Sequence, residues 1–342
     1  GIAGGLANVP AGFVGDRFAK RRAEILSVTI IAVSVFAVAL GLATNFLMAV
    51  IAASLLSVAI SFWHPAAISS LSREFASRRG FAISLHGTGG SMGETLGPIL
   101  VGALLGIISW RLVLQGSVIP GLVFGIAIWA FLRTVPTSTS SGVSMMGYLG
   151  SVSALLRNGK LLLVLIFAAG FAGGQSTILT FLPIYLDEDL GASSVTIGLY
   201  LSLAQVGGIV SQPLIGFASD RLGRKLILAP SLAMLGLSFV GLSIVPSGWL
   251  FGLVVLAMGA FLFPLMSILL ASAMDLVEGG AQATTVSLVF GSAVVVSAFA
   301  PAIAGILADS ADTEAAFLFG AGLVLSASLL SAVTRWKPKA PD

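Results

Sequence analysis

The sequence predicts an all-α protein that crosses a membrane many times. Of its 342 residues, 57% are hydrophobic and 9% are charged, whereas a soluble domain carries roughly a quarter charged residues. Apolar runs of ~19 residues or more recur along the chain, each long enough to cross a hydrocarbon layer of ~30 Å as a helix. The hydrophobicity excludes a disordered chain, and the absence of cysteine excludes a disulfide scaffold.

The expected membrane segments cover most of the chain. Their ranges are 24–43, 46–72, 81–108, 111–135, 161–186, 194–219, 226–246, 249–274, 281–308 and 313–334, with a partial segment at 1–15. The stretch 136–160 begins with PTSTSSGVS and is polar and rich in Ser, Thr and Gly, a composition typical of a linker. We therefore expect transmembrane bundles at 1–135 and 161–335, joined by this linker and followed by a tail at 336–342.

The cations identify the cytoplasmic side. If the loops are assigned alternately to the two sides, every one of the 17 Lys and Arg residues except Arg111 falls on the same side. Lys and Arg are enriched in cytoplasmic loops, so we expect that side, with the linker and the tail, to be cytoplasmic. The expected location is a cell membrane, the inner membrane of a bacterium. The cations occupy short loops and not one face, so no nucleic-acid partner is expected.

The two halves of the chain repeat each other. Asp16 and Asp220 lie 204 positions apart within similar loops. Both copies keep the same orientation, which makes them a parallel repeat, an arrangement found in transporters whose substrate site lies between the halves. Residues 161–204 have no counterpart before Gly1. We therefore expect a fold of two six-helix bundles, of which the first helix and most of the second precede this chain.

Each repeat carries a basic loop around its aspartate. The second copy comprises Gly216, Asp220, Arg221, Gly223, Arg224 and Lys225, and the first comprises Gly12, Asp16, Arg17, Lys20 and Arg21. Both resemble motif A of the major facilitator superfamily, G-x-x-x-D-R-x-G-R-K/R. The first copy departs from the motif at Ala19 and Lys20, where the family has Gly and Arg. The resemblance covers the whole chain and implies that family's fold.

The resemblance also implies a cytoplasmic gate. An aspartate can accept hydrogen bonds from the N-terminus of a neighbouring helix. The loop cations can pair with Glu74 and Asp275, which stand at similar places in the two halves. Together these contacts would close the cytoplasmic side and stabilise an outward-open state. The alternative is that the cations only anchor the topology of the chain.

The segment 81–108 carries a second resemblance. Gly93, Gly97, Pro98 and Gly102 look like part of motif C, which marks the drug–proton antiporters of the superfamily. Small residues four positions apart let two membrane helices approach closely, and proline bends a helix. Ordinary helix packing without any role in antiport is the alternative.

Glu94 is the only acidic residue deep inside an expected membrane segment. It lies about 14 positions from the cytoplasmic end of 81–108, or ~20 Å along a helix, near the middle of the bilayer. An ionisable side chain at that depth costs free energy and is a functional candidate. Glu94, His64 and His86 are therefore the candidates for proton coupling. The alternatives are a neutral, hydrogen-bonded Glu94 and histidines that only pack; no cluster of acids or cysteines suggests a metal.

Neutral polar side chains near mid-depth in the second half are candidates for a substrate cavity. They are Gln175, Ser176 and Thr180 in the segment 161–186 and Gln205 in the segment 194–219. Such groups can hydrogen-bond a polar substrate whatever its charge. Alternatively, they hold helices together, with under ~1 kcal/mol from each.

The resemblance and these candidates predict a secondary transporter. The stretch from His64 to Arg111 is similar to the branch of the superfamily that includes fosmidomycin-resistance efflux proteins, which implies export of a small toxic or metabolic compound. The sequence has no phosphate-binding loop of the G-x-x-x-x-G-K-[ST] kind, so we expect neither an enzyme nor a cofactor. We expect a monomer that exports a small organic compound in exchange for protons by alternating access. The alternatives are a proton symporter or facilitator that imports a metabolite, and a transport-inactive membrane sensor on the same fold.

Overall fold

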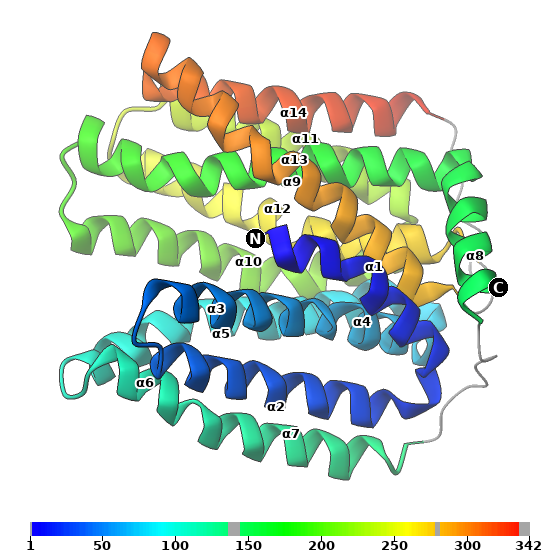
Figure 1. Ribbon diagram of the computed structural model, residues 1–342. Helices are drawn as coiled ribbons and strands as arrows, with labels where there is room; N and C mark the ends of the chain where they lie inside the picture. The colour runs from blue at the N-terminus through cyan, green and yellow to red at the C-terminus, as the bar shows by residue number, and fades with distance from the viewer. Residues whose placement is uncertain (1, 136–143, 278–280, 335–342) are drawn as a thin grey trace. The chain divides into compact units, whose positions relative to one another are not determined.

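The computed structural model describes residues 2–135, 144–277 and 281–334, which form helices joined by short connections (Figure 1). The helices are α1 (Ile2–Arg17), α2 (Arg22–Gly41), α3 (Phe46–Ser61), α4 (Trp63–Glu74), α5 (Arg79–Leu105), α6 (Trp110–Gly116), α7 (Val118–Leu132), α8 (Met145–Arg157), α9 (Gly159–Ile184), α10 (Ser194–Leu222), α11 (Arg224–Ile244), α12 (Trp249–Met274), α13 (Gln282–Ser310) and α14 (Thr313–Val333). The described residues include no strand, which confirms the expected all-α fold.

Nine spans of the described chain are helical, long and apolar enough to cross a membrane. Two of them consist of two consecutive α-helices, α3 with α4 and α6 with α7. The helix α5 is 27 residues long but is not one of the nine. Its glycines, His86 and Glu94 explain the difference, because they lower the hydropathy of a helix that is otherwise long enough.

The expected linker is partly helical. Its second part forms α8, whereas 136–143 and the expected tail at 336–342 lie outside the described residues. On α8, the side chains of Tyr148 and Leu155 are buried, while Met146 and Leu149 are exposed.

The two motif loops differ in backbone conformation. Between α10 and α11, Gly223 has a φ of 99°, a region that glycine adopts at little cost because it has no Cβ. Ala19 stands at the matching position of the first loop, and there the chain forms a short 3-10 turn, Ala19–Arg21. The following helix therefore begins at Arg22, two positions later than Arg224 in the repeat.

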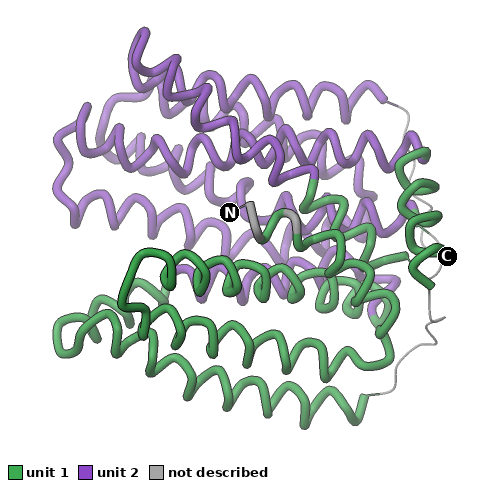
Figure 2. Tube along the Cα trace, in the orientation of Figure 1, with its two compact units in different colours: residues 1–74, 96–157, 277–291 green, residues 75–95, 158–276, 292–342 purple. Residues whose placement is uncertain are grey.

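The described helices form two compact units (Figure 2). Unit 1 comprises residues 1–74, 96–157 and 277–291, and unit 2 comprises residues 75–95, 158–276 and 292–342. Each unit thus contains a segment from the other half of the sequence. As a result, α5 and α13 each contribute one part to unit 1 and one part to unit 2.

Each unit has its own core. In unit 1, α2 contacts α3, α4, α6 and α7, and Leu26 of α2 packs with Ala66 and Ala67 of α4. In unit 2, α10 packs on α12, and α14 packs on α9 and α11. The core of unit 2 contains large aromatic side chains with no exposed area: Phe167, Phe171, Phe239, Phe251 and Phe317.

Candidate functional site

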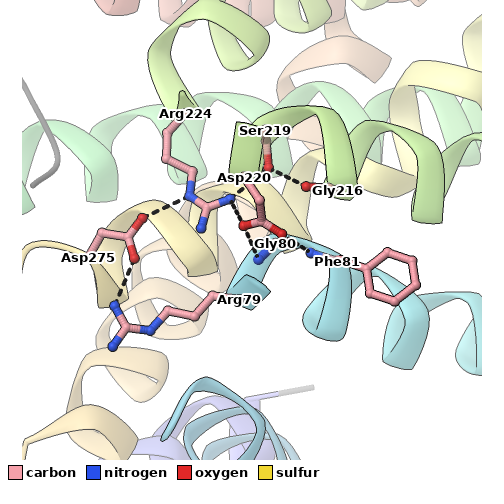
Figure 3. Close-up of polar contacts among 8 residues, drawn as sticks. All are labelled: Arg79, Gly80, Phe81, Gly216, Ser219, Asp220, Arg224 and Asp275. Atoms are coloured by element: carbon pink, nitrogen blue, oxygen red, sulfur yellow. Dashed lines mark hydrogen bonds and ion pairs between the residues drawn. The ribbon is translucent and has the colours of Figure 1, made fainter. Parts of the chain in front are cut away.

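The end of α10 contacts the beginning of α5 within unit 2 (Figure 3). The Asp220 carboxylate accepts hydrogen bonds from the backbone N–H groups of Gly80 and Phe81, each at 2.8 Å. The N–H groups in the first turn of a helix have no partner inside that helix, and the helix dipole favours a negative charge there. Asp220 therefore caps α5 from a helix more than a hundred positions away in the sequence.

An ion-pair network surrounds this cap (Figure 3). Arg224 lies 2.6 Å from Asp220 and 2.8 Å from Asp275, and it also donates to the Ser219 hydroxyl at 2.7 Å. Arg79 reaches the other oxygen of Asp275 at 2.8 Å. The side chains of Arg224 and Asp220 are only 7% and 5% exposed. Two cations and two anions thus neutralise one another where water is largely excluded.

Small residues allow the two helix ends to meet. A Cβ added at Gly216 would lie 2.6 Å from the Gly80 carbonyl oxygen and 2.7 Å from the Ser84 Cβ. Such distances are shorter than van der Waals contact, so both glycines are needed for this approach.

The first repeat forms the matching contact within unit 1. Asp16 accepts hydrogen bonds from the backbone N–H groups of Ala283 at 2.8 Å and Thr284 at 2.9 Å, and from the Thr284 hydroxyl. These two residues lie in the first turn of α13, 203 positions after Gly80 and Phe81. Asp16 follows the expected segment 1–15 and is only 2% exposed. Burial raises the pKa of its carboxyl, while the hydrogen bonds from Thr284 and Ala283 oppose that rise.

Tyr148 of α8 lies beside this contact. Its hydroxyl donates to the Val9 carbonyl oxygen at 2.6 Å, and its ring meets Phe13 edge-on with centroids 5.2 Å apart. Burial, and to a lesser extent the Asp16 carboxylate, raise the pKa of the Tyr148 phenol. The linker helix is therefore attached to α1 within one unit.

The cations of the two loops play different parts. Glu74 pairs with Arg22 at 2.6 Å, whereas Lys20 stands at the position that matches Arg224. The 3-10 turn before α2 accounts for this difference, because it delays the helix by two positions. Sequence reasoning missed both Arg22 and Arg79; each directly begins a helix, and that position is the signal that could have identified them.

Three further motif cations contact other groups. The guanidinium of Arg17 lies 5.6 Å from the Phe13 ring centroid, and that of Arg221 lies 4.3 Å from the Phe217 ring centroid. Lys225 donates to the Thr334 carbonyl oxygen at 2.8 Å. Arg21 is exposed.

Nearer the middle of α5 and α10, the two helices are joined by hydrogen bonds between polar side chains within unit 2. Gln205 Nε2 donates to Glu94 Oε2 at 3.3 Å, and Gln212 Nε2 donates to the Ser91 hydroxyl at 2.8 Å. Gln212 is 1% exposed, and an added Cβ at Gly87 would collide with its amide oxygen. The structure thus brings Glu94 and Gln205 together; sequence reasoning singled out both, but missed Gln212 and Ser91.

The histidines lie elsewhere. The His64 ring stacks on Phe290 within unit 1, with centroids 5.0 Å apart. His86 is partly buried on α5, and it precedes Glu94 by eight positions, or about 12 Å along the helix axis. A proton relay from His86 to Glu94 would therefore need an intervening group.

The candidates on α9 are engaged in helix packing to different degrees. The Ser176 hydroxyl donates to the Ser297 carbonyl oxygen of α13 at 3.0 Å, and Thr180 donates to the Ser176 carbonyl oxygen of its own helix at 2.8 Å. Gln175 is partly buried, and Thr180 is exposed.

The glycines of the expected helix-packing motif face open space. A Cβ added at Gly93, Gly97 or Gly102 would meet no atom of the described chain within 4 Å. The close helix approach expected at these glycines is found instead at Gly80 and Gly87, earlier on α5. Pro98 lies inside α5, which continues past it to Leu105.

The described residues contain no group of three or more His, Asp or Glu side chains that could hold a metal ion. The polar contacts that the structure shows are hydrogen bonds at Glu94 and Gln212 and ion-pair networks at the helix ends.

Comparison with known proteins identifies relatives along the whole chain. The profile described as Major Facilitator Superfamily matches residues 1–188 and 164–342. The fosmidomycin resistance protein of Escherichia coli (strain K12) is 24% identical over 293 residues, which cover 84% of this chain and 71% of that protein. The cis,cis-muconate transport protein of Acinetobacter baylyi (strain ATCC 33305 / BD413 / ADP1) is 23% identical over 236 residues, covering 66% of this chain and 56% of that protein.

Solved structures show the same fold. The E. coli fucose:proton symporter superposes with a TM-score of 0.77 at 12% identity, covering 95% of this chain and 86% of that chain. The human organic anion transporter MFSD10 gives 0.72 at 18% identity, with 96% and 82% covered. The proton:xylose symporter bound to 6-bromo-6-deoxy-D-glucose gives 0.71 at 15% identity, with 96% and 83% covered.

Proposed function

The chain belongs to the major facilitator superfamily, and we propose that it exports a small organic compound in exchange for protons. As a member of this family it is a multi-pass membrane transporter. Export is supported by the similarity to a fosmidomycin resistance protein and by the motif around Pro98. The absence of a nucleotide-binding loop from the sequence suggests that an ion gradient supplies the free energy.

The contact between Glu94 and Gln205 carries the proposal. Glu94 lies midway along α5, in an expected membrane segment, and its side chain is exposed. Its hydrogen-bond partner is a neutral amide at 3.3 Å, and no cation of the described residues forms an ion pair with it. A carboxylate without a cationic partner is costly at that depth, so gaining and losing a proton changes the free energy of the site strongly. Glu94 would take a proton from the outer side and release it to the cytoplasm in alternation with the substrate.

The helix-end contacts supply the conformational part of the mechanism. Asp220 of α10 caps the first turn of α5, and Asp16 of α1 caps the first turn of α13. These are matching contacts of the two repeats. We assign them the role of holding the cytoplasmic side closed. Opening that side would break the capping hydrogen bonds, and the released N–H groups and carboxylates would then be hydrated. The hydrogen bonds of each contact would therefore form together and break together, as a two-state gate requires.

The test uses the protein in inside-out vesicles with an inside-acid pH gradient. A panel of small antibiotics and organic acids is added while a pH-sensitive dye reports the gradient. We expect at least one compound to dissipate the gradient, and we expect Glu94→Gln to abolish that response while membrane insertion is unchanged. The matched control is Glu188→Gln, the same change at an exposed position in the π-helical turn Tyr185–Asp189. Proton flux in Glu94→Gln equal to that of the unaltered protein would refute the assignment.

Import by proton symport is the second candidate. It is favoured by the likeness to the muconate transport protein, and proton symporters are among the solved structures of the same fold. Substrate uptake into right-side-out vesicles driven by an outside-acid gradient would distinguish import from export.

A further inference from the structure

A small cavity lies between the beginning of α2 and the end of α7, within unit 1. Its volume is about 270 Å³. It is lined by Lys20, Arg22, Ala23, Glu24, Leu132, Arg133, Thr134 and Val135. The two helices lie side by side and run in opposite directions, so these ends meet at the same end of the unit (Figure 1). That end carries the cations that the sequence assigns to the cytoplasmic surface.

The lining of the cavity is positively charged. Arg22 is largely neutralised by Glu74 at 2.6 Å. The remaining charged residues of the lining are two cations, Lys20 and Arg133, and one acid, Glu24. Three residues of the first turn of α2, Arg22, Ala23 and Glu24, also line the cavity, and the preceding Arg21 gives this turn no side-chain cap. First-turn N–H groups favour an anion, so the backbone and the side chains act in the same direction.

The surroundings of the cavity are apolar on the membrane side. Arg133 stacks on Trp129, with its guanidinium 4.2 Å from the ring centroid. Tryptophan is enriched at the level of the lipid headgroups. Phe131 and Val28, each close in sequence to a lining residue, are 76% and 63% exposed. A ligand in the cavity would therefore have apolar protein surface next to it, on the side where acyl chains lie.

We propose that this cavity binds the phosphate of an anionic phospholipid, with Lys20 and Arg133 contacting the headgroup and the acyl chains lying on the exposed apolar surface of α2 and α7. The cavity is large enough to hold a phosphodiester group, and its lining carries an excess of positive charge. Basic pockets between helices at the cytoplasmic surface suit the headgroups of such lipids. This proposal does not depend on the substrate or on the direction of transport.

The experiment measures lipid binding to the purified, detergent-solubilised protein by native mass spectrometry. Phosphatidylglycerol and phosphatidylcholine are titrated separately. We expect Arg133→Gln and Lys20→Gln each to weaken phosphatidylglycerol binding about fivefold, while phosphatidylcholine binding is unchanged. Arg157→Gln is the matched control, because it removes the same charge from an exposed position outside the cavity. Unaltered phosphatidylglycerol binding in both cavity variants would overturn the proposal.

Two further measurements keep the result decisive. Arg133→Lys retains the charge and should retain most of the binding; if Arg133→Gln fails to fold, this variant and Lys20→Gln decide the outcome. Inorganic phosphate is then added as a competitor at millimolar concentration. Competition by free phosphate as strong as that by phosphatidylglycerol would mean that the cavity takes a soluble anion, and it would overturn the assignment to a lipid.

Discussion

Gln205 on α10 donates a hydrogen bond to Glu94 on α5, with 3.3 Å between Gln205 Nε2 and Glu94 Oε2. The other end of the amide, Gln205 Oε1, is buried and accepts no hydrogen bond from the part of the chain that the structure describes. An amide can donate to a carboxylate and accept from a protonated carboxyl. Gln205 can therefore serve Glu94 in both protonation states.

Replacing Gln205 should weaken proton coupling. Gln205→Leu removes both the donor and the acceptor next to Glu94, and a hydrogen bond to a charged group contributes about 1.5–3 kcal/mol. We expect substrate-induced proton flux to fall roughly tenfold or more, with a changed dependence on pH. Dye-based flux measured at several pH values checks this.

Gln212→Leu is the comparison for that variant. Gln212 is buried and pairs with Ser91, not with Glu94. We expect it to lower thermal stability while the number of protons moved per substrate stays the same. If Gln205→Leu behaves like Gln212→Leu, Gln205 is a packing residue only.

Neutralising Asp220 should destabilise the end of α10. Asp220→Asn keeps an oxygen that can accept from Gly80 but loses the ion pair with Arg224, whose side chain is 7% exposed. Removing one partner of a largely buried ion pair costs about 3 kcal/mol or more. We expect a lower melting temperature in detergent and slower transport, whereas the exposed Asp309→Asn should change neither. Equal melting temperatures for Asp220→Asn and the unaltered protein would show that the ion pair contributes no net stability.

Two glycines of α5 should respond differently to replacement by alanine. A Cβ at Gly80 would lie 2.5 Å from the Ser219 hydroxyl and 2.7 Å from the Gly216 carbonyl oxygen, while a Cβ at Gly93 meets nothing within 4 Å. We expect Gly80→Ala to cost about 1–3 kcal/mol through overpacking and Gly93→Ala to have little effect on stability. Thermal aggregation followed by size-exclusion chromatography measures both. A larger loss for Gly93→Ala would contradict the packing of α5 described above.

The loop glycine and its counterpart form a second matched pair. Gly223 has a φ of 99°, and Ala19 occupies the matching position in a 3-10 turn. We expect Gly223→Ala to cost roughly 1–3 kcal/mol, because an L-residue is strained in that backbone conformation, whereas Ala19→Gly should cost less. The same melting measurement applies, and similar losses from both changes would contradict the different loop conformations.

The positions of the helices could be predicted from the sequence with little error. Hydrophobic runs of membrane length end near charged loops, and those boundaries agree with α9, α12 and α14 to within a few residues. The length of a span and its hydropathy are properties of a local stretch, so they do not depend on the neighbouring helices. The same reasoning identified Glu94 and Gln205 by depth alone, but it could not say that they touch.

Other partners were not predictable in this way. Lys20 aligns with Arg224, yet Arg22 pairs with Glu74, because one missing glycine changes the turn that precedes α2. Gln212 lies on the same apolar helix as Gln205, and nothing in the sequence around it indicates that Ser91 and Gly87 of α5 lie next to its amide.

The sequence by itself determined the all-α membrane architecture, the repeat that relates Asp16 to Asp220, and the resemblance that the superfamily match bears out. Only the tertiary structure decided which groups meet: Asp220 with the first turn of α5, Arg22 with Glu74, and Gln205 with Glu94. The reason is physical. Hydropathy is a property of each span, whereas a contact between two spans depends on how each helix is rotated and how closely its small residues let the backbones approach.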